Sequence, residues 1–369
     1  MFSRELVLAP QVVQVEFALV PAINVLNSLH LTGQVERLSG LGEWVTRMAA
    51  GLTPADRRME AMLRDGLALV VNDALPMEDY PDFPSFLNDW NRFDAVELRD
   101  RLLDYVLRLP YEQPSCWKPN APVPSADEVL ASPDAYLAFM RSFEEMEDVD
   151  TGLWTEFWGL LAEPARLQTE ISVFLTRAWE TSGLREEWGR SVLLLTESVT
   201  AFQKQAYRNL TALEAIRAVT GRDMSGFDHW VLSQVDRVLF VPSAHMGPYV
   251  SGLARGTTLY LVFGARAPQG VSTPSPDLSR AELLIRLNAL ADDTRLHILE
   301  LLTRHDELCA QEIIEELALS QSSVSRHLSQ LSASGYLIER RRDVNKCYSL
   351  NRERANEVVR ALRSFLTLQ

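Results

Sequence analysis

Residues 320–335 read SQSSVSRHLSQLSASG. When this stretch is laid out as a helix, Val324, Leu328 and Leu331 fall within about 60° of one another and form one apolar stripe. The opposite face carries hydroxyls, an amide and a guanidinium, which can donate to phosphates or read base edges without filling a groove. The stretch therefore predicts a short helix that buries one face and offers the other to DNA.

The flanking residues predict where this helix begins and ends. Ser320 is placed to cap it, because a serine hydroxyl accepts a hydrogen bond from a free backbone N–H, and Gly335 suits the position at which a helix stops. Two extended segments follow, Leu337–Arg342 and Lys346–Leu350, and they predict a hairpin with a basic tip. A helix of this kind followed by a basic hairpin is typical of a winged helix-turn-helix domain that grips duplex DNA.

Four further helices complete the predicted domain. Three precede the quoted stretch, at Arg280–Ala289, Asp292–Thr303 and Gln311–Ala318, and one follows the hairpin at Arg352–Leu368. We expect the quoted helix and the hairpin to contact double-stranded DNA. The expected DNA-binding residues are Ser320, Gln321, Ser322, Ser323, Ser325, Arg326, His327, Ser329, Gln330, Arg340, Arg341, Arg342 and Lys346.

A homodimer is expected because a single winged helix reads only one half of a palindromic site. Apolar residues recur on one face of the last helix, and the first helix could join them at a two-fold interface. The expected dimerisation residues are Leu283, Leu287, Val358, Val359, Leu362, Phe365 and Leu366.

The charge is divided unevenly along the chain. The net charge is −14 over 369 residues, yet the segment from residue 279 onward holds 13 basic and 13 acidic residues and is neutral. The first 278 residues hold 23 basic and 37 acidic residues and carry all of the excess. Phosphate repels such an acidic region, so we expect it to sit away from DNA while the C-terminal segment binds.

A linker separates these two regions in the sequence. The stretch ARAPQGVSTPSP at 265–276 contains three prolines and can neither continue a helix nor pair in a central strand. We expect an acidic sensor or interaction domain at 1–264, a linker at 265–278 and the winged helix-turn-helix domain at 279–369. A proline-rich stretch near 110–133 is a candidate boundary between two lobes of the first domain.

Helical periodicity dominates the first domain. Three segments rich in β-formers, Val12–Val20, Val235–Val241 and Thr257–Phe263, predict a small sheet that joins the start of the domain to its end. The predicted helices include Ala55–Val71, Ala95–Leu109, Trp154–Trp179 and Glu187–Val219. The expected fold class is α+β and mostly helical: a C-terminal winged helix-turn-helix plus a larger helical N-terminal domain with a small β-sheet.

All eight tryptophans precede the linker. Core packing is the first interpretation of them, and an aromatic-lined pocket for an apolar or cationic small molecule is the alternative. The candidate ligand-binding residues are Trp154 and Trp158, one helical turn apart, and His245 and Tyr249 in the loop PSAHMGPY.

The C-terminal layout resembles the ArsR/SmtB family of winged-helix repressors. The matching residues are LADDTRLHILELL at 290–302, ELCAQEIIEELALSQSSVSRHLSQLSASGYL at 307–337 and CYSL at 347–350. The resemblance covers about the last quarter of the chain. It implies a homodimer that binds an imperfect palindrome near a promoter, usually as a repressor released by a signal.

Metal sensing, for which this family is best known, is not expected here. Its thiolate sensors carry two cysteines one residue apart at the start of the third helix, where this chain has Cys309 and Gln311. One thiolate cannot build a site of three or four ligands, and Cys347 lies too far along the motif to be an obvious partner. The family's alternative zinc site uses histidines and acids of the last helix, which here offers Glu353 and Glu357 without a histidine. We expect no metal and no cofactor.

The remaining bulk properties indicate a cytoplasmic protein. Cys116, Cys309 and Cys347 are odd in number and far apart, so a disulfide framework is not expected and a reducing compartment fits best. No run of about 18 apolar residues predicts a membrane span, and the acidic N-terminus is a poor signal peptide.

Three functions are compatible with the sequence. The leading hypothesis is a dimeric repressor on a palindromic operator, whose DNA affinity changes when a small-molecule effector or protein partner binds the N-terminal domain. The second is a constitutive DNA-tethering protein whose N-terminal domain only dimerises or binds a protein partner. The third is an enzyme fused to a DNA-binding tail. The first domain lacks the Walker A, GxGxxG, HExxH and GxSxG motifs, so no enzymatic activity is expected.

Overall fold

A computed structural model shows two compact units in the chain. The residues that it describes are 11–35, 38, 41, 43–63, 80–112, 117–118, 121–143, 150–221, 232, 234–247, 249–266, 268, 280–342 and 345–367. One unit comprises Met1–Ala18, Ser198–Phe240 and Pro248–Gln369, and the other comprises Leu19–Glu197 and Val241–Gly247. The linker at 265–278 remains a prediction, because most of it lies outside the described residues, as does part of the stretch at 110–133.

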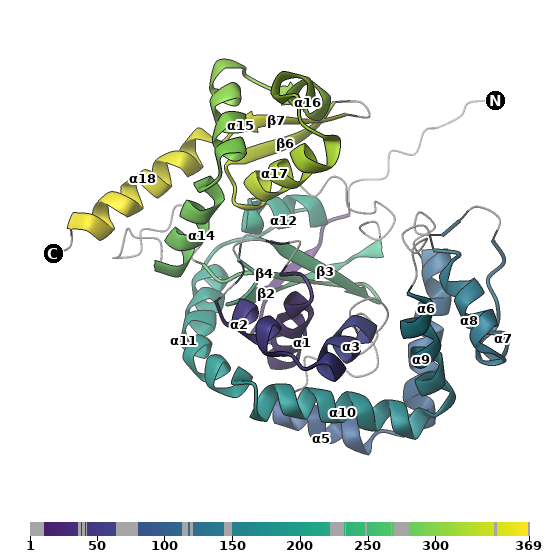
Figure 1. The fold of residues 1–369 in the computed structure, drawn as a ribbon. Helices are drawn as coiled ribbons and strands as arrows, with labels where there is room; N and C mark the ends of the chain where they lie inside the picture. The colour runs from purple at the N-terminus through teal and green to yellow at the C-terminus, as the bar shows by residue number, and fades with distance from the viewer. Residues whose placement is uncertain are drawn as a thin grey trace, which may run out of the picture. The chain divides into compact units, whose positions relative to one another are not determined.

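A four-stranded sheet joins the start of the chain to residues 237–264. Its strands are β1 (Gln14–Phe17), β2 (Arg237–Ser243), β3 (Val250–Arg255) and β4 (Thr258–Gly264), in the order β1-β2-β4-β3. β1 runs parallel to β2, whereas β3 and β4 form an antiparallel hairpin that turns at Gly256 with a φ of 55° (Figure 1). The predicted sheet is confirmed. The sequence did not predict β3, which contains Gly252 and lies directly before Gly256.

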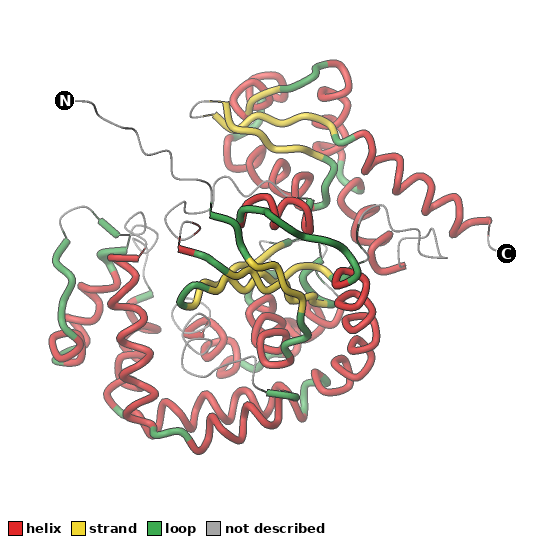
Figure 2. The backbone as a smooth tube through the Cα atoms, turned by 180° about the vertical axis from the view of Figure 1, so that it is seen from behind, coloured by secondary structure: helices red, strands yellow, loops and turns green. Residues whose placement is uncertain are grey.

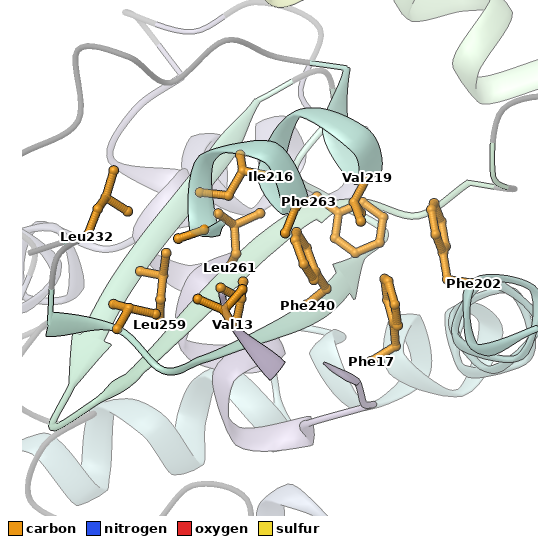
Figure 3. Packing of buried hydrophobic residues seen from close by; sticks show 14 residues of the cluster. Val13, Phe17, Phe202, Ile216, Val219, Leu232, Phe240, Leu259, Leu261 and Phe263 are labelled. Carbon is orange, nitrogen blue, oxygen red and sulfur yellow. The ribbon is translucent and has the colours of Figure 1, made fainter. Parts of the chain in front are cut away.

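Helix α12 (Ala212–Thr220) packs on this sheet through a core of large apolar side chains. Ile216 and Val219 of α12 lie over Leu261 and Phe263 of β4 (Figure 3). The ring of Phe263 also meets that of Phe240 edge-on at 6.1 Å. Each such side chain contributes about 1.5–3 kcal/mol by leaving water, so this core ties the sheet to the helix.

The second unit is built mainly of helices. They are α1 (Pro21–Thr32), α2 (Glu43–Gly51), α3 (Pro54–Met62), α5 (Phe83–Arg92), α6 (Ala95–Glu112), α7 (Ala126–Leu130), α8 (Pro133–Met140), α9 (Thr151–Ala162), α10 (Pro164–Glu180) and most of α11 (Leu184–Gln203). α10 packs against α5, α6 and α9 (Figure 1). Tryptophan supplies part of the core, since Trp90 and Trp179 are buried.

Two predicted helices are each divided in the structure. The segment Trp154–Trp179 breaks into α9 and α10 at Pro164, which occupies the first turn of α10, because proline has no N–H to donate inside a helix. The segment Glu187–Val219 breaks into α11 and α12. Thr211 begins the second of these with a capping box, in which its hydroxyl and the Glu214 carboxylate bond each other's backbone N–H groups.

The winged helix-turn-helix domain has the predicted elements with bounds that agree to within one or two residues. Its helices are α14 (Arg280–Leu290), α15 (Asp293–Arg304), α16 (Ala310–Leu317), α17 (Gln321–Ala333) and α18 (Arg352–Thr367). Its strands are β5 (Leu308–Cys309), β6 (Leu337–Arg342) and β7 (Asn345–Leu350), in the order β5-β7-β6. β5 was not predicted. The fold class is α+β and mostly helical, as expected.

The end of α17 explains how this helix joins the hairpin of β6 and β7. Gly335 adopts a φ of 82°, which lets the Tyr336 N–H reach back to the Leu331 carbonyl at 2.9 Å. The Gly335 N–H bonds the Ser332 carbonyl at 3.0 Å, and together these bonds form a Schellman motif. Tyr336 is 1% exposed, so the turn also places this side chain in the core of the domain.

Substitution of Ala318 by glycine is expected to stabilise the domain. Ala318 ends α16 in the left-handed region (φ 52°, ψ 34°), where a Cβ atom is unfavourable by about 1–2 kcal/mol. Glycine removes that strain but adds freedom to the unfolded chain, so the free energy of unfolding should rise by only about 0.5–1 kcal/mol in urea titrations. Ala310→Gly, at the right-handed start of the same helix, is the control and should lower it. A loss of stability in Ala318→Gly would contradict the expectation.

Candidate nucleic-acid interface

Helix α17 rests its apolar face on the domain core and turns its polar face to solvent. Val324, Leu328 and Leu331 are at most 1% exposed, which confirms the predicted stripe. Ser320 caps the helix by accepting a hydrogen bond from the Ser323 N–H at 3.3 Å. The exposed residues of the expected DNA-binding set on this helix and its cap are Ser320, Gln321, Ser322, Ser325, Arg326 and Ser329.

Two other expected contacts on α17 have partners inside the domain. The side-chain oxygen of Gln330 accepts a hydrogen bond from Arg295 Nη1 at 2.7 Å. His327 is 8% exposed, and its Nδ1 lies 3.5 Å from a carboxylate oxygen of Asp292. The structure thus places Gln330 as an anchor between α15 and α17, and it buries His327 beside Asp292 rather than on the exposed face of α17.

Arg295 is the centre of this anchor, and sequence reasoning missed its role. Its guanidinium donates to Gln330 and to the backbone carbonyls of Ala289 at 2.6 Å and Asn288 at 3.0 Å. Asp292 caps α15 by accepting from the Arg295 N–H at 2.9 Å. Burial raises the pKa of Asp292, but this bond and the Arg295 charge outweigh burial and hold the pKa below its ordinary value. The sequence signal for this role was Arg295 itself, a charged residue among the regularly spaced apolar residues of the predicted helix Asp292–Thr303.

The wing presents its basic residues from two paired strands. The register places Arg341 of β6 opposite Lys346 of β7 at the tip. The side chains of residues 340–342 lie outside the described residues. Lys346 is exposed, and its Nζ lies 2.9 Å from a carboxylate oxygen of Glu339. An exposed pair of this kind is worth about 0–1 kcal/mol, so Lys346 can exchange this partner for a phosphate.

The dimerisation residues divide into buried and exposed sets. Leu283 and Val358 are 4% and 3% exposed and belong to the core of their own domain, so their assignment to a dimer interface was wrong. Leu287 and Leu362 are partly buried against the same core. The residues that remain on the surface of α18 are Val359, Phe365 and Leu366, at 57%, 52% and 67% exposed.

Comparison with known proteins identifies this domain. The sequence profile described as bacterial regulatory protein, arsR family, matches residues 292–339, which contain α15, α16 and α17. An arsenical resistance operon repressor of Staphylococcus aureus is 36% identical over 86 residues, which are 23% of this chain and 81% of that protein. The chain belongs to the arsR family of bacterial regulatory proteins. Its C-terminal domain is therefore of the DNA-binding type that transcriptional regulators of this family carry.

Other arsR-family relatives match the same part of the chain. An arsenic resistance transcriptional regulator of Pseudomonas putida is 44% identical over 69 residues, which are 19% of this chain and 54% of that protein. The chain therefore spans about half the length of that relative. An uncharacterised HTH-type transcriptional regulator of Methanocaldococcus jannaschii is 33% identical over 72 residues, which are 20% of this chain and 81% of that protein.

The cysteines of the arsR-family domain overturn one expectation from the sequence. Cys309 of β5 and Cys347 of β7 are direct partners in the register and form a disulfide. Cys347 is therefore adjacent to Cys309 despite a separation of 38 residues, and the expectation that it lies too far along the motif to be a partner was wrong. Cys116 lies outside the described residues. Glu357 of α18 also differs from a free surface acid, since it accepts a hydrogen bond from the buried Arg286 at 3.0 Å.

The pairing does not supply a metal site. Two sulfur ligands are fewer than the three or four that thiolate-metal centres require. Within the described ranges, no three or more His, Cys, Asp or Glu side chains lie together as a metal site would need.

The stability of the arsR-family domain should fall with acidification below pH 6.5. Burial lowers the pKa of His327 below 6.5; the Asp292 carboxylate raises it, and Arg295 and Arg326 lower it further. The folded chain then binds this proton more weakly than the unfolded chain, so stability is lost as pH falls from 6.5 through the folded pKa. The slope of unfolding free energy against pH should be shallower in His327→Gln. It should be unchanged in the control Ser329→Ala, which alters an exposed residue of the same helix that does not titrate. An unchanged slope in His327→Gln would refute the assignment.

The four candidate ligand-binding residues of the N-terminal region differ in their surroundings. Trp154 is 2% exposed on α9 and packs against Tyr136 and Phe157, so it is a core residue. Trp158 is partly buried on the same helix, and Tyr249 is partly buried before β3.

His245 has a polar and aromatic environment of its own. It stacks on Trp44 at 5.0 Å, its Nδ1 lies 2.7 Å from the Ser28 hydroxyl, and its Nε2 lies 3.5 Å from Glu187. The cavity beside it has a volume of about 10 Å³ and is lined by His245, Ser28 and Trp188 among others. That space is about enough for one water molecule, so in this conformation it does not accept an effector.

In the part of the chain that the structure describes, no helix is long and apolar enough to cross a membrane.

Proposed function

We propose that the protein is a homodimeric transcriptional repressor that binds a palindromic operator with α17 and the wing of each subunit. The observation that carries this proposal is the exposed polar face of α17, fixed by Ser320 at one end and Gly335 at the other. Side chains that are exposed on a rigid helix can enter a major groove without reorganisation of the backbone.

The surface of α18 supports the two-fold assembly. Val359, Phe365 and Leu366 are exposed apolar side chains on a helix that projects from the rest of the winged helix (Figure 2). A second copy of the same helix is a self-complementary cover for such a surface. The dimer would place two copies of α17 for two half-sites, which is the arrangement that a palindrome requires.

Charging this surface should break the dimer. We expect Phe365→Glu/Leu366→Glu to weaken self-association by about 2–4 kcal/mol, because two apolar anchors would be replaced by charges that must be desolvated. Analytical ultracentrifugation measures this, and gel shifts on the DNA upstream of the gene should lose cooperative occupancy of paired half-sites. Val96→Glu, at an exposed valine of α6, is the control and should leave both measurements unchanged. A double variant that stays dimeric would exclude α18 as the interface.

The N-terminal region would modulate DNA affinity. An effector or partner shifts DNA binding only by the difference in its binding energy between the two states of the dimer. The alternative is a constitutive DNA tether, whose N-terminal region only dimerises or binds a protein. The small size of the His245 cavity favours a protein partner or a site elsewhere over a small molecule at this position. Operator affinity of the full chain, compared with that of fragment 279–369 across salt concentrations, separates modulation from tethering.

A further inference from the structure

The disulfide of the winged helix joins two parts of the DNA-binding apparatus. Cys309 is the N-cap residue of α16, the first helix of the helix-turn-helix, and Cys347 lies in wing strand β7. Cys347 follows Lys346 directly and pairs in register with Arg340. A covalent bond between these two cysteines therefore connects the helix-turn-helix to the strand that carries the wing cations.

The compartment in which a DNA regulator works indicates that this bond is redox-sensing rather than structural. Proteins that act on chromosomal DNA meet reducing thiol systems, and disulfides in such compartments are usually transient and redox-sensing rather than structural. The domain also has an apolar core of its own, with Ile298, Ile313 and Leu331 fully buried, so the bond is not the main source of its stability.

We propose that Cys309 and Cys347 are a reversible oxidation site for peroxide, and that the disulfide form binds operator DNA more tightly than the dithiol form. This proposal rests on the DNA-binding function of the domain. In the first step, the Cys309 thiolate attacks one peroxide oxygen, the O–O bond breaks, and hydroxide leaves a sulfenic acid on Cys309. In the second step, the Cys347 sulfur attacks that sulfur, the S–O bond breaks, and water leaves. Overall two thiols lose two electrons and two protons, and hydrogen peroxide becomes two waters. A small dithiol reverses the change by thiol–disulfide exchange.

The positions of the two residues suit these roles. Cys309 stands at the positive N-terminal end of α16, which favours the thiolate form that attacks peroxide. Both side chains are buried, at 5% and 0% exposed. β5 is a two-residue edge strand of its sheet, so separation of only this short strand admits a molecule as small as peroxide.

The direction of the effect follows from the folded form that carries the bond. In the form that carries the disulfide, α17 is capped at Ser320 and β6 pairs with β7 in full register. A wing that is held in place before binding loses less freedom when it meets DNA. We therefore expect the oxidised form to bind the operator roughly 5- to 10-fold more tightly than the reduced form.

The test uses the full-length protein equilibrated in buffers of reduced and oxidised glutathione at several ratios. Free thiols are counted by alkylation and mass spectrometry, and affinity for the upstream DNA and for an unrelated duplex is measured in the same samples. Peroxide added to reduced protein should restore the Cys309–Cys347 disulfide and the tighter binding together. Cys116→Ser is the matched control and should respond like the parent, whereas Cys309→Ser and Cys347→Ser should bind at the reduced level in every buffer.

Each other outcome overturns the proposal. A bond that excess thiol does not reduce in the folded protein would be a structural disulfide, and so would a domain whose circular dichroism collapses on reduction. Equal or tighter operator binding by the folded dithiol form would refute the link between the bond and DNA affinity. Failure of every form to bind any duplex would count against the DNA-binding function, whereas the thiol counts would still report whether the pair is reversible.

Discussion

Arg295→Ala is expected to lower the free energy of unfolding of the winged helix by about 3–5 kcal/mol. Arg295 is 8% exposed and its guanidinium holds three acceptors at 2.6–3.0 Å: the Ala289 and Asn288 carbonyls and the Gln330 side chain. Removal of the guanidinium leaves the carbonyl of the buried Ala289 and the part-buried Gln330 oxygen without this donor, and it leaves Asp292 without its cation. Each unsatisfied group costs about 1–3 kcal/mol, so the losses accumulate.

Hydrogen exchange of the amides in α15 and α17 measures this loss within the full chain. The control is Arg304→Ala, which removes an exposed arginine paired with Glu300 one turn earlier on the same helix. Such a surface pair contributes about 0.3–0.5 kcal/mol, so exchange should hardly change. Equal exchange in the two variants would show that the buried network does not hold α17 on α15.

Arg326→Ala is expected to weaken operator binding by about 1–3 kcal/mol with no loss of folding stability. Arg326 is exposed on the polar face of α17, where a guanidinium can bond a guanine edge or a phosphate. If it reads a base, its loss should relax the preference for one position of the operator. If it bonds a phosphate, binding to all DNA sequences should weaken alike. The slope of log affinity against log salt concentration should then fall in magnitude by about one.

Gel shifts across a range of salt concentrations, with the operator and with single-base variants, distinguish the two roles of Arg326. Arg304→Ala serves as the control here too, because it removes an exposed arginine of α15 rather than of the recognition helix. Unchanged affinity in Arg326→Ala would remove this residue from the contact set and would weaken the assignment of the polar face of α17 to DNA.

The sequence by itself determined the elements whose signals are local. The apolar stripe of Val324, Leu328 and Leu331 fixes which face of α17 is buried, since residues three and four apart share a helix face. Ser320 and Gly335 fix its ends, because capping depends on backbone groups within one turn. These local signals, with the hairpin that follows, were enough to predict the winged helix and its family.

Only the tertiary structure decided the pairings between distant segments. Cys309 and Cys347 are 38 residues apart and meet because β5 pairs with the wing strand β7. β5 is only two residues long, so it leaves no pattern in the sequence. Gln330 lies on the flank of α17, and whether it faced DNA or Arg295 depended on how α15 packs there. Leu283 and Val358 showed the periodicity of an interface but fill the core of their own domain. Periodicity reports that a side chain is buried, and the packing of other elements determines what buries it.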